Sequence, residues 1–255
     1  ISAGSFDLNK WLYGGYEKDI ITMIVGPPGS GKTNFVILAA CSQAKKGSKV
    51  IFVDTEGGFS VDRIKQIAPE SYEEILKNFL ILSPTSFEEQ KKSFEKLLKS
   101  LKDTENRKFS VPFKTGSFEG KSVGLIVVDG MAMLYRLELG DAVKSKEEGK
   151  IKEVNREIAK QMRALAEISR KQNIPVLITN QVYSEFLSEE ELKKGVKKEM
   201  NIVGGDLTKY WSKCIIELQN EKGKRKAVLL KHRSLPQKEM SFEIRNEGVF
   251  KRGLF

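Results

Sequence analysis

Histidine is almost absent from this chain of 255 residues, and cysteine is scarce. His232 is the single histidine, and the two cysteines, Cys41 and Cys214, lie far apart in the sequence. A histidine-rich metal site is therefore excluded, and so is a zinc site built on CxxC pairs. A catalytic triad would have to depend on His232 alone. Two widely spaced cysteines are typical of a protein from a reducing, cytoplasmic compartment.

Long hydrophobic runs are missing as well. The longest clearly apolar run near the start covers 20–25, whereas a helix needs about 20 apolar residues to cross a bilayer. No apolar stretch of signal-peptide length precedes a cleavage site of small residues. We therefore expect a protein that does not span a membrane and is not exported.

Charge, in contrast, is abundant and unbalanced. The chain is 31% charged and 40% hydrophobic, and 44 Lys and Arg against 34 Asp and Glu give a net charge of +10. This composition is typical of a globular protein, and the length fits one hydrophobic core, so we expect a single domain over 1–255. The positive excess permits binding to nucleic acid. Lys/Glu-rich surfaces also serve solubility and thermal stability, so charge alone leaves both explanations open.

Hydrophobic periodicity predicts an α/β fold. Apolar runs indicate buried strands at 20–25, 49–54, 123–128 and 176–179, and helical patterns follow at 34–46, around 87–101 and at 151–172. Such alternation is typical of a mostly parallel central sheet with flanking helices. The last part differs, because 214–218, 226–231 and 240–244 read as an antiparallel extension. Residues 103–122 read as a polar insertion.

The strongest motif follows the first predicted strand. The sequence there is GPPGSGKT, formed by Gly26, Pro27, Pro28, Gly29, Ser30, Gly31, Lys32 and Thr33. It matches GxxxxGK[ST] between a strand and a helix, the context that a phosphate-binding loop requires. The glycines let backbone N–H groups turn toward an anion at the helix N-terminus. Lys32 is expected to reach the β- and γ-phosphates, and the Thr33 hydroxyl to bind Mg²⁺.

Two carboxylates at strand ends complete the pattern. Asp129 ends the apolar strand 124–129, as in a Walker B motif, and is expected to hold Mg²⁺. Glu56 lies just after the strand that follows the loop helix, on the expected γ-phosphate side, where it would activate water. A solvated loop glutamate is the alternative for Glu56.

Together these residues resemble the ATPase core of the RecA/RadA recombinase family, and within it the short archaeal paralogs. The resemblance covers nearly the whole chain. The shared segments are, in order, LNKWL with two glycines, GPPGSGKT, DTEGGF, LIVVDG followed by Ala132, Leu134, Tyr135 and Arg136, then ITNQV and LPQKE. It implies a RecA-type P-loop ATPase core that binds ATP and Mg²⁺.

The resemblance also assigns further site residues. Gln181 would join Glu56 and Lys32 in the catalytic set by sensing the γ-phosphate, although it could merely cap a strand. Arg63 falls where the family stacks an arginine on adenine, with a solvated helix arginine as the alternative. Pro236 would belong to a cap over the nucleotide of a neighbouring subunit, and a plain turn proline fits nearly as well.

Departures from the family pattern affect the expected DNA contacts. The helix-hairpin-helix domain and the polymerisation linker of RadA are expected to be missing, which predicts weak homo-oligomers rather than filaments active in strand exchange. The segment 183–205 mixes lysines with glutamates, so it is not a basic loop. The basic excess lies in Lys222, Lys224, Arg225, Lys226, Lys231 and Arg233. We expect that hairpin, together with Arg136, to contact DNA phosphates, with a solvated turn as the alternative.

The favoured hypothesis is an ATP- and DNA-binding accessory protein of recombination and repair with weak ATP hydrolysis. It would bind single-stranded or branched DNA largely independently of sequence, and the resemblance implies the RadA recombinase and a Holliday-junction nuclease as partners. A small-molecule kinase and a regulatory ATPase of the circadian-clock type remain the alternatives.

Overall fold

The computed structural model describes the chain except for 103–107, 110–117, 120–121, 185–199, 222 and 254–255. Its helices are α1 (Phe6–Trp11), α2 (Lys32–Lys45), α3 (Val61–Ile67), α4 (Tyr72–Leu76), α5 (Phe87–Lys102), α6 (Met133–Lys144), α7 (Glu148–Gln172) and α9 (Gly205–Trp211). The strands of the parallel part are β1 (Ile21–Gly26), β2 (Lys49–Asp54), β3 (Phe79–Leu82), β6 (Val123–Asp129) and β7 (Val176–Ser184). The remaining strands are β4 (Lys108–Phe109), β5 (Phe118–Glu119), β8 (Met200–Ile202), β9 (Ser212–Glu221), β10 (Lys224–Lys231), β11 (Lys238–Arg245) and β12 (Gly248–Lys251).

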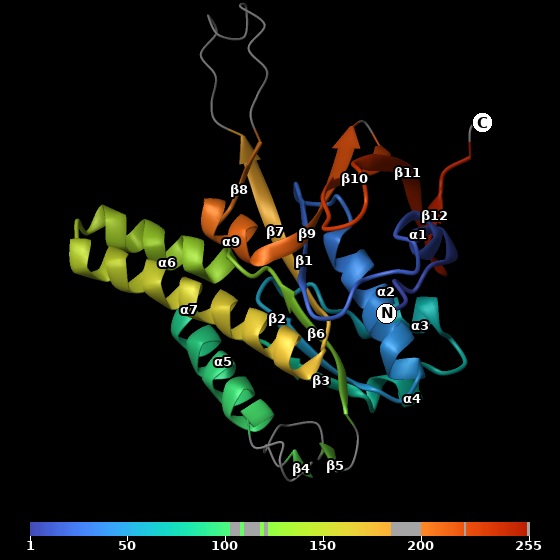
Figure 1. Ribbon diagram of the computed structural model, residues 1–255, viewed down its shortest axis with the longest axis horizontal. Coiled ribbons are helices and arrows are strands. Elements are labelled where there is room, and N and C mark those ends of the chain that lie inside the picture. The colour runs from blue at the N-terminus through green and yellow to red at the C-terminus, as the bar shows by residue number, and fades with distance from the viewer. Residues whose placement is uncertain (103–107, 110–117, 120–121, 185–199, 222, 254–255) are drawn as a thin grey trace, which may run out of the picture.

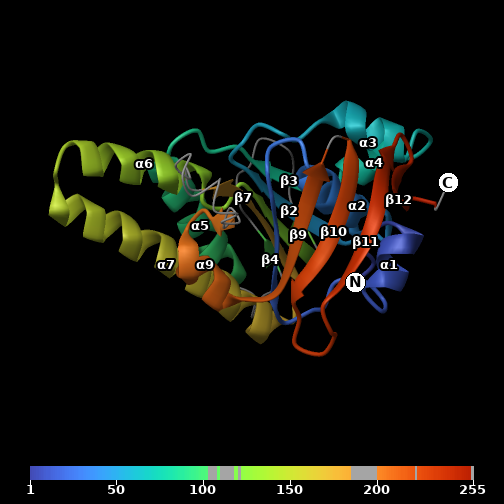
Figure 2. The same ribbon diagram turned by 90° about the horizontal axis from the view of Figure 1, so that it is seen from above.

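One twisted sheet runs through the molecule (Figure 1, Figure 2). Its order is β12-β11-β10-β9-β1-β7-β6-β2-β3, with β8 added to the end of β7. Every pair from β9 to β3 is parallel, and the pairs from β9 to β12 are antiparallel. The predicted fold class is therefore confirmed. One detail was not foreseen, because β9 joins β1 in parallel and so links the antiparallel extension to the parallel sheet.

The sheet separates two hydrophobic clusters. On one face α1, α2, α3 and α4 cover the strands, with Phe35, Leu38 and Phe52 in the cluster. On the other face α5, α6 and α7 pack over strand side chains such as Met23 and Ile126. All residues of β1 are buried, because both faces of this central strand are covered by helices. The predicted apolar runs thus correspond to strands in the middle of the sheet.

The ends of several elements differ from the sequence-based predictions. Helix α7 begins at Glu148, earlier than the predicted start at 151, whereas it ends at Gln172 as predicted, followed by the C-cap Asn173 with a left-handed φ of 54°. Strand β7 continues through Ser184 instead of ending at Thr179, because β8 pairs with its final residues. The predicted insertion 103–122 contains the short pair β4–β5, and most of that segment lies outside the described residues.

The short helices and α6 were missed by periodicity. Helix α1 has only six residues and depends on Ser5, whose side chain accepts a hydrogen bond from the backbone N–H of Leu8. Helix α6 leaves Leu137 and Val143 exposed, so its apolar residues do not form a single stripe. None of the helices that the structure describes combines the length and apolar character needed to cross a bilayer.

Candidate functional site

The phosphate loop, residues 26–33, connects β1 to α2 at the carboxyl edge of the parallel strands. Gly29 and Gly31 have φ angles of 71° and 108°, which side chains rarely tolerate. At Gly26, a Cβ atom would come within 2.4 Å of the backbone oxygen of Leu218 on β9. The Ser30 hydroxyl is buried and has no hydrogen-bond partner within the described part of the chain. The loop is therefore shaped by its glycines to bring backbone N–H groups toward an anion at the N-terminus of α2.

Lys32 lies across this loop. Its side chain is only 6% exposed, and Nζ donates hydrogen bonds to the backbone oxygens of Gly26 at 3.0 Å and Pro27 at 3.1 Å. Burial lowers the pKa of Lys32, while Glu56 and Asp129 act in the opposite direction. An ammonium group held by two carbonyl oxygens in this place is positioned to meet the phosphates that the loop would bind.

The side-chain oxygens of Asp129 and Thr33, the two predicted Mg²⁺ ligands, lie next to each other. The Thr33 hydroxyl donates to Asp129 Oδ2 at 2.7 Å, and the Thr179 hydroxyl donates to Asp129 Oδ1 at 2.5 Å. Burial raises the pKa of Asp129, the two hydroxyls oppose this, and the carboxylates of Glu56 and Asp54 reinforce it. A cation beside Asp129 would offset the free-energy cost of burying this carboxylate in its charged form.

These donors fit Mg²⁺. Within the described residues, no group of three or more His, Cys, Asp or Glu side chains is placed to hold a metal ion by itself. Mg²⁺ prefers oxygen ligands and is commonly held by one or two protein groups together with phosphate oxygens and water. The Thr33 and Asp129 oxygens would supply the protein's share of such a set.

Glu56 and Gln181 meet although 125 residues separate them in the chain. Gln181 Nε2 donates to Glu56 Oε1 at 3.3 Å. The strand order explains the meeting, since Glu56 follows β2 and Gln181 lies on β7, both flanking β6. Gly130, directly after β6, is required as well, because a Cβ atom there would lie 2.6 Å from Glu56 Cγ. The structure thus brings the two predicted catalytic residues together at the edge that holds Asp129.

Several residues that sequence reasoning missed support this edge. The carboxylate of Asp54 accepts hydrogen bonds from the backbone N–H groups of Gly58 and Phe59 at 3.1 and 3.0 Å, which shapes the turn that carries Glu56. Asn180 Oδ1 accepts from Ala132 N at 3.0 Å, and its Nδ2 donates to Val203 O at 3.3 Å. A run of polar residues at strand ends, DT and TNQ, was the available signal for these roles.

Arg63 lies beside the phosphate loop, and its guanidinium donates hydrogen bonds to other residues of the chain. Its Nε donates to Asn34 Oδ1 at 2.7 Å, and its two terminal nitrogens donate to the backbone oxygens of Arg245 and Asn246 at 2.9 Å. It therefore fixes the β11–β12 turn against α2, so the alternative of a freely solvated helix arginine is wrong. Stacking on adenine stays a prediction.

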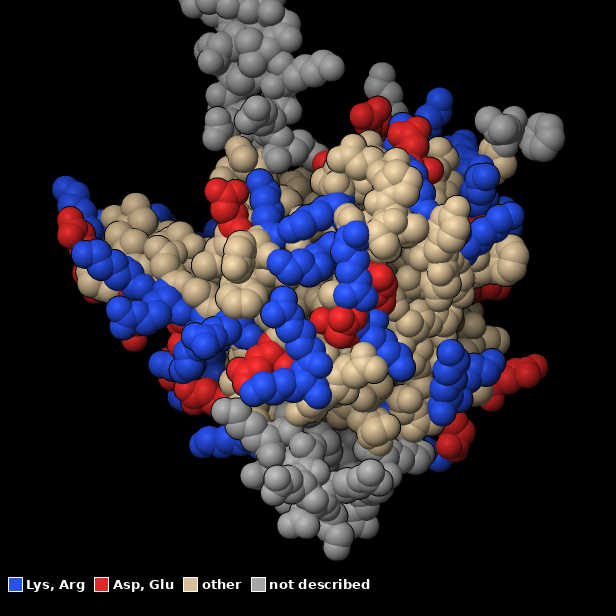
Figure 3. Space-filling view, in the orientation of Figure 1, with Lys and Arg blue, Asp and Glu red and all other residues tan. Residues whose placement is uncertain are grey.

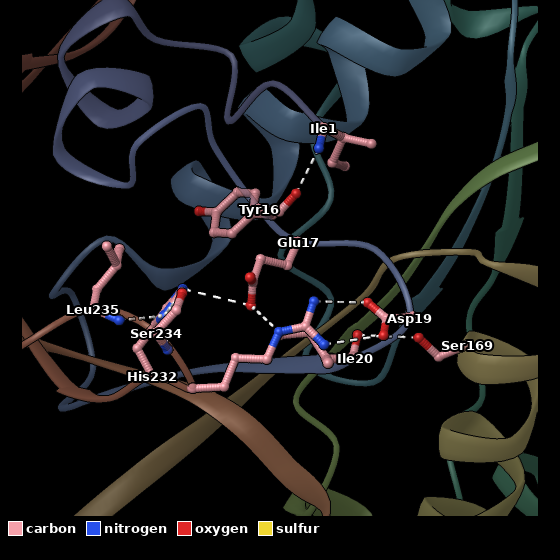
Figure 4. Close-up of polar contacts among 10 residues, drawn as sticks. Ile1, Tyr16, Glu17, Asp19, Ile20, Ser169, His232, Ser234 and Leu235 are labelled. Atoms are coloured by element: carbon pink, nitrogen blue, oxygen red, sulfur yellow. Dashed lines mark hydrogen bonds and ion pairs between the residues drawn. The ribbon is translucent and has the colours of Figure 1, made fainter.

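Pro236 is not brought to the phosphate loop of its own chain. It lies between β10 and β11, at the edge of the sheet where β1 begins. Figure 4 shows Glu17 and Asp19, which precede β1, directed toward this loop. Arg233 forms ion pairs with Glu17 and Asp19 at 3.0 Å, and the backbone N–H groups of Ser234 and Leu235 donate to His232 Nδ1. The predicted role of Pro236 over the nucleotide of another subunit stays a prediction.

In the folded structure, carboxylates from other segments lie beside some of the cations of the basic hairpin. Lys226 pairs with Glu239 of β11 at 3.0 Å, Lys231 donates to the backbone oxygen of Lys209, and Arg233 is paired as described above. Two cations of the predicted basic excess, Lys226 and Arg233, are therefore paired with carboxylates that β11 and the segment before β1 bring alongside, and the predicted DNA contacts of this hairpin stay a prediction. Figure 3 likewise shows acidic side chains among the lysines and arginines on that face. Lys224 and Arg225 remain at the tip, whereas Lys222 and most of 183–205 lie outside the described residues.

Arg136 is exposed on α6, and its guanidinium lies 5.6 Å from the ring centre of Tyr183 on β7. Together with Glu56 and Gln181 it borders a small cavity next to the predicted catalytic residues. Its predicted contact with DNA stays a prediction.

Comparison with known proteins agrees with this geometry. The Rad51 family model matches residues 1–252. Proteins named "DNA repair and recombination protein RadB" from Methanobrevibacter smithii and Methanocaldococcus jannaschii are each 38% identical, over 95% of this chain and 92% and 98% of their own lengths. A solved structure described as a crystal structure of the RadB recombinase is similar at 31% identity and a TM-score of 0.69, over 99% of both chains. The chain therefore belongs to the Rad51/RecA family, within its RadB group.

Proposed function

We propose that this protein is an ATP-dependent accessory factor of DNA repair and recombination that binds DNA and hydrolyses ATP slowly. Proteins of the Rad51/RecA family are nucleotide-binding ATPases that typically use Mg²⁺. The observation that carries the proposal is the contact between Glu56 and Gln181 beside the Thr33–Asp129 pair. It supports a hydrolytic site rather than a kinase site, because a kinase would need no carboxylate to activate a water molecule.

In this proposal the loop and its neighbours divide the work. Backbone N–H groups of 29–33 and the Lys32 ammonium bind the phosphates of ATP. Thr33 and Asp129 would hold Mg²⁺, which neutralises charge on the β- and γ-phosphates when bound. Glu56 orients a water molecule and accepts its proton as the water oxygen bonds to the γ-phosphorus and the bond to the leaving ADP oxygen breaks. Gln181 holds the Glu56 carboxylate in place.

DNA would be bound by phosphate contacts from Lys224, Arg225 and Arg136, largely independently of sequence. Gln181 and Tyr183 both lie on β7, and the Arg136 guanidinium lies over the Tyr183 ring. A change at the γ-phosphate that moves Gln181 would therefore also alter the position of Arg136. Single-stranded or branched DNA, a RadA-type recombinase and a Holliday-junction nuclease are the partners that this role implies.

Reciprocal coupling between ATP and DNA tests the proposal. ATP turnover is measured with and without single-stranded DNA, and DNA affinity is measured with ATP, with ADP and without nucleotide. We expect slow turnover and a DNA affinity that depends on the nucleotide, and Lys32→Ala should remove that dependence. Phosphoryl transfer to a small molecule, or nucleotide-driven assembly that ignores DNA, would overturn the proposal.

A further inference from the structure

Helix α9 holds an aromatic side chain outward on a firm support. Tyr210 is 67% exposed, whereas Leu207 and Trp211 of the same helix pack against the hydrophobic cluster that α5, α6 and α7 cover. The Trp211 ring meets the Tyr210 ring edge to face, with 5.3 Å between the ring centres. The Ser212 hydroxyl donates to Thr208 O at 2.8 Å at the end of the helix. The Tyr210 ring is therefore fixed in place while most of its surface faces solvent.

Lysines from three elements lie close to this ring. Lys213 on β9 has its Nζ atom 5.3 Å from the centre of the Tyr210 ring and donates to Tyr210 O at 3.2 Å. Lys231, at the end of β10, donates to the backbone oxygen of Lys209 in the last turn of α9 at 3.0 Å. Figure 3 shows Lys and Arg side chains gathered in the middle of this face, between the positions that α9 and β10 have in Figure 1. We call Lys209, Tyr210, Lys213 and Lys231 the α9 patch.

Two ammonium groups of the α9 patch are not neutralised by carboxylates of the described residues. Lys209 pairs with Asp206 at 3.8 Å, whereas within the described part of the chain Lys213 and Lys231 donate to backbone oxygens and form no ion pair. Burial lowers the pKa of Lys231, and the nearby Lys213 ammonium lowers it further. The two positive charges thus repel each other, and an anion bound beside them would offset that repulsion.

An exposed ring next to unpaired ammonium groups has the chemistry that binds a single-stranded nucleic acid. Proteins hold unpaired strands by stacking bases on aromatic side chains and by contacting the backbone phosphates with cations. A base stacked on Tyr210 would bring its neighbouring phosphates toward Lys213 and Lys231. A small anion would use the lysines but leave the ring without a partner. The bases of a blunt duplex are already stacked on one another, so they would not reach the ring.

We propose that the α9 patch is a contact surface for single-stranded nucleic acid, with one base stacked on Tyr210 and the neighbouring phosphates bound by Lys213 and Lys231. This contact rests on the DNA binding of the proposed function and adds a site to it. The contacts proposed above for the hairpin and for α6 involve phosphates alone, which duplex and single strand share. Tyr210 is the residue that favours the unpaired strand.

The stacking is tested by fluorescence anisotropy without nucleotide, using a labelled oligothymidine of about 15 nucleotides and a blunt duplex of the same length. Tyr210→Ser should weaken binding to the oligothymidine by about 5-fold to 150-fold, the loss expected for one base–aromatic stack, and should leave duplex binding nearly unchanged. Tyr210→Phe retains the ring and should bind as the wild type does. Circular dichroism should be the same for all variants.

Tyr13→Ser is the matched control for the ring. Tyr13 is 81% exposed just beyond α1, and it also has a lysine over its ring, with Lys238 Nζ 4.5 Å from the ring centre. It should bind both DNAs as the wild type does. Equal losses on both DNAs, or a Tyr210→Ser variant with wild-type affinity for oligothymidine, overturn the α9 contact and leave the proposed function standing. A wild-type protein that binds neither DNA overturns both.

The phosphate contacts are tested by the salt dependence of oligothymidine binding. The variant with Lys213→Gln and Lys231→Gln should have a slope of log affinity against log salt that is smaller by about 1.4, because each contact with a single strand contributes about 0.7. The variant with Lys77→Gln and Lys171→Gln is the matched control, since it removes the same charge from lysines that lie 2.5 and 2.6 Å from glutamate oxygens. Equal changes of slope in both variants would reflect net charge alone and contradict the contact.

Discussion

Lys32 and Glu56 occupy different places around the phosphate loop. Lys32 is buried against the loop carbonyls, and Glu56 is exposed beside Gln181. A cation at the phosphates contributes to binding ATP in the ground state, whereas a carboxylate that accepts the proton of water contributes only as the bond to the γ-phosphorus forms. The two residues should therefore have separable effects.

We expect Lys32→Ala to lose affinity for ATP, and Glu56→Gln to bind ATP normally while hydrolysing it about two to four orders of magnitude more slowly. Calorimetric titration with ATP and release of inorganic phosphate measure the two effects. Gln at 56 retains the shape of the side chain and an oxygen that accepts from Gln181. Normal hydrolysis by Glu56→Gln would show that another group activates the water.

At the scale of elements, the β9–β10 hairpin presents two kinds of cation. Lys226 is neutralised by Glu239 on β11, whereas Lys224 and Arg225 lie nearer the tip with no ion pair among the described residues. Only cations that contact phosphate release counterions from DNA, and each such contact contributes about 0.9 to the slope of log affinity against log salt.

Replacing Lys224 and Arg225 by glutamine should therefore flatten the salt dependence of DNA binding by roughly two contacts. Lys226→Gln is the matched control and should change the slope less, since Glu239 already pairs with that lysine. Fluorescence anisotropy over a salt series gives the slopes. An unchanged slope in the double variant would move the phosphate contacts elsewhere, with Arg136 as the next candidate.

The β10–β11 loop also contains a titratable residue, His232, whose side chain is buried. Its side chain is 4% exposed, Nδ1 accepts two backbone hydrogen bonds, and Nε2 faces Glu17 Oε2 at 3.6 Å. Burial lowers the pKa of His232 below the ordinary 6.5, Glu17 opposes this, and Lys238 and Arg233 assist it. Protonation of Nδ1 would occupy the lone pair that accepts these two backbone hydrogen bonds, so both would be lost.

Because the unfolded chain then binds the proton more readily than the folded one, this residue should stabilise the fold above pH 6.5. The contribution should decline as the pH falls from about 6.5 toward the lower pKa of the folded state. Urea unfolding between about pH 5 and pH 7.5 measures it, with His232→Gln as the comparison. If the variant loses stability with falling pH as steeply as the wild type does, other groups cause the effect.

At the scale of the whole molecule, the proposed nucleotide site lies where four parallel strands end. The phosphate loop, Asp129, Glu56 and Gln181 come from β1, β6, β2 and β7 or the turns after them. A ligand that binds this folded edge and not the unfolded chain stabilises the entire fold by mass action.

ATP with Mg²⁺ at 100 times its Kd should stabilise the protein by about 2.7 kcal/mol, which for this size corresponds to a rise in Tm of roughly 5–10 °C. Differential scanning fluorimetry at fixed protein concentration measures the shift. Lys32→Ala should show no comparable rise at the same ATP concentration. An equal rise in that variant would place the nucleotide at a different site.

The sequence by itself determined the features that are formed by residues adjacent in the chain. The phosphate loop needs glycines at fixed spacing directly after a strand, and Asp129 needs only to end an apolar run, so both are written within a few residues. The central strands were also predictable, because burial on both faces leaves an unbroken apolar run in β1, β2 and β6.

Only the tertiary structure decided which distant side chains meet. The contact of Glu56 with Gln181 depends on the strand order, and so do the ion pairs that join Lys226 to Glu239 and Arg233 to Asp19. Reading along the chain shows the cations of the hairpin but not their carboxylate partners, because a carboxylate on a neighbouring strand is invisible to sequence spacing.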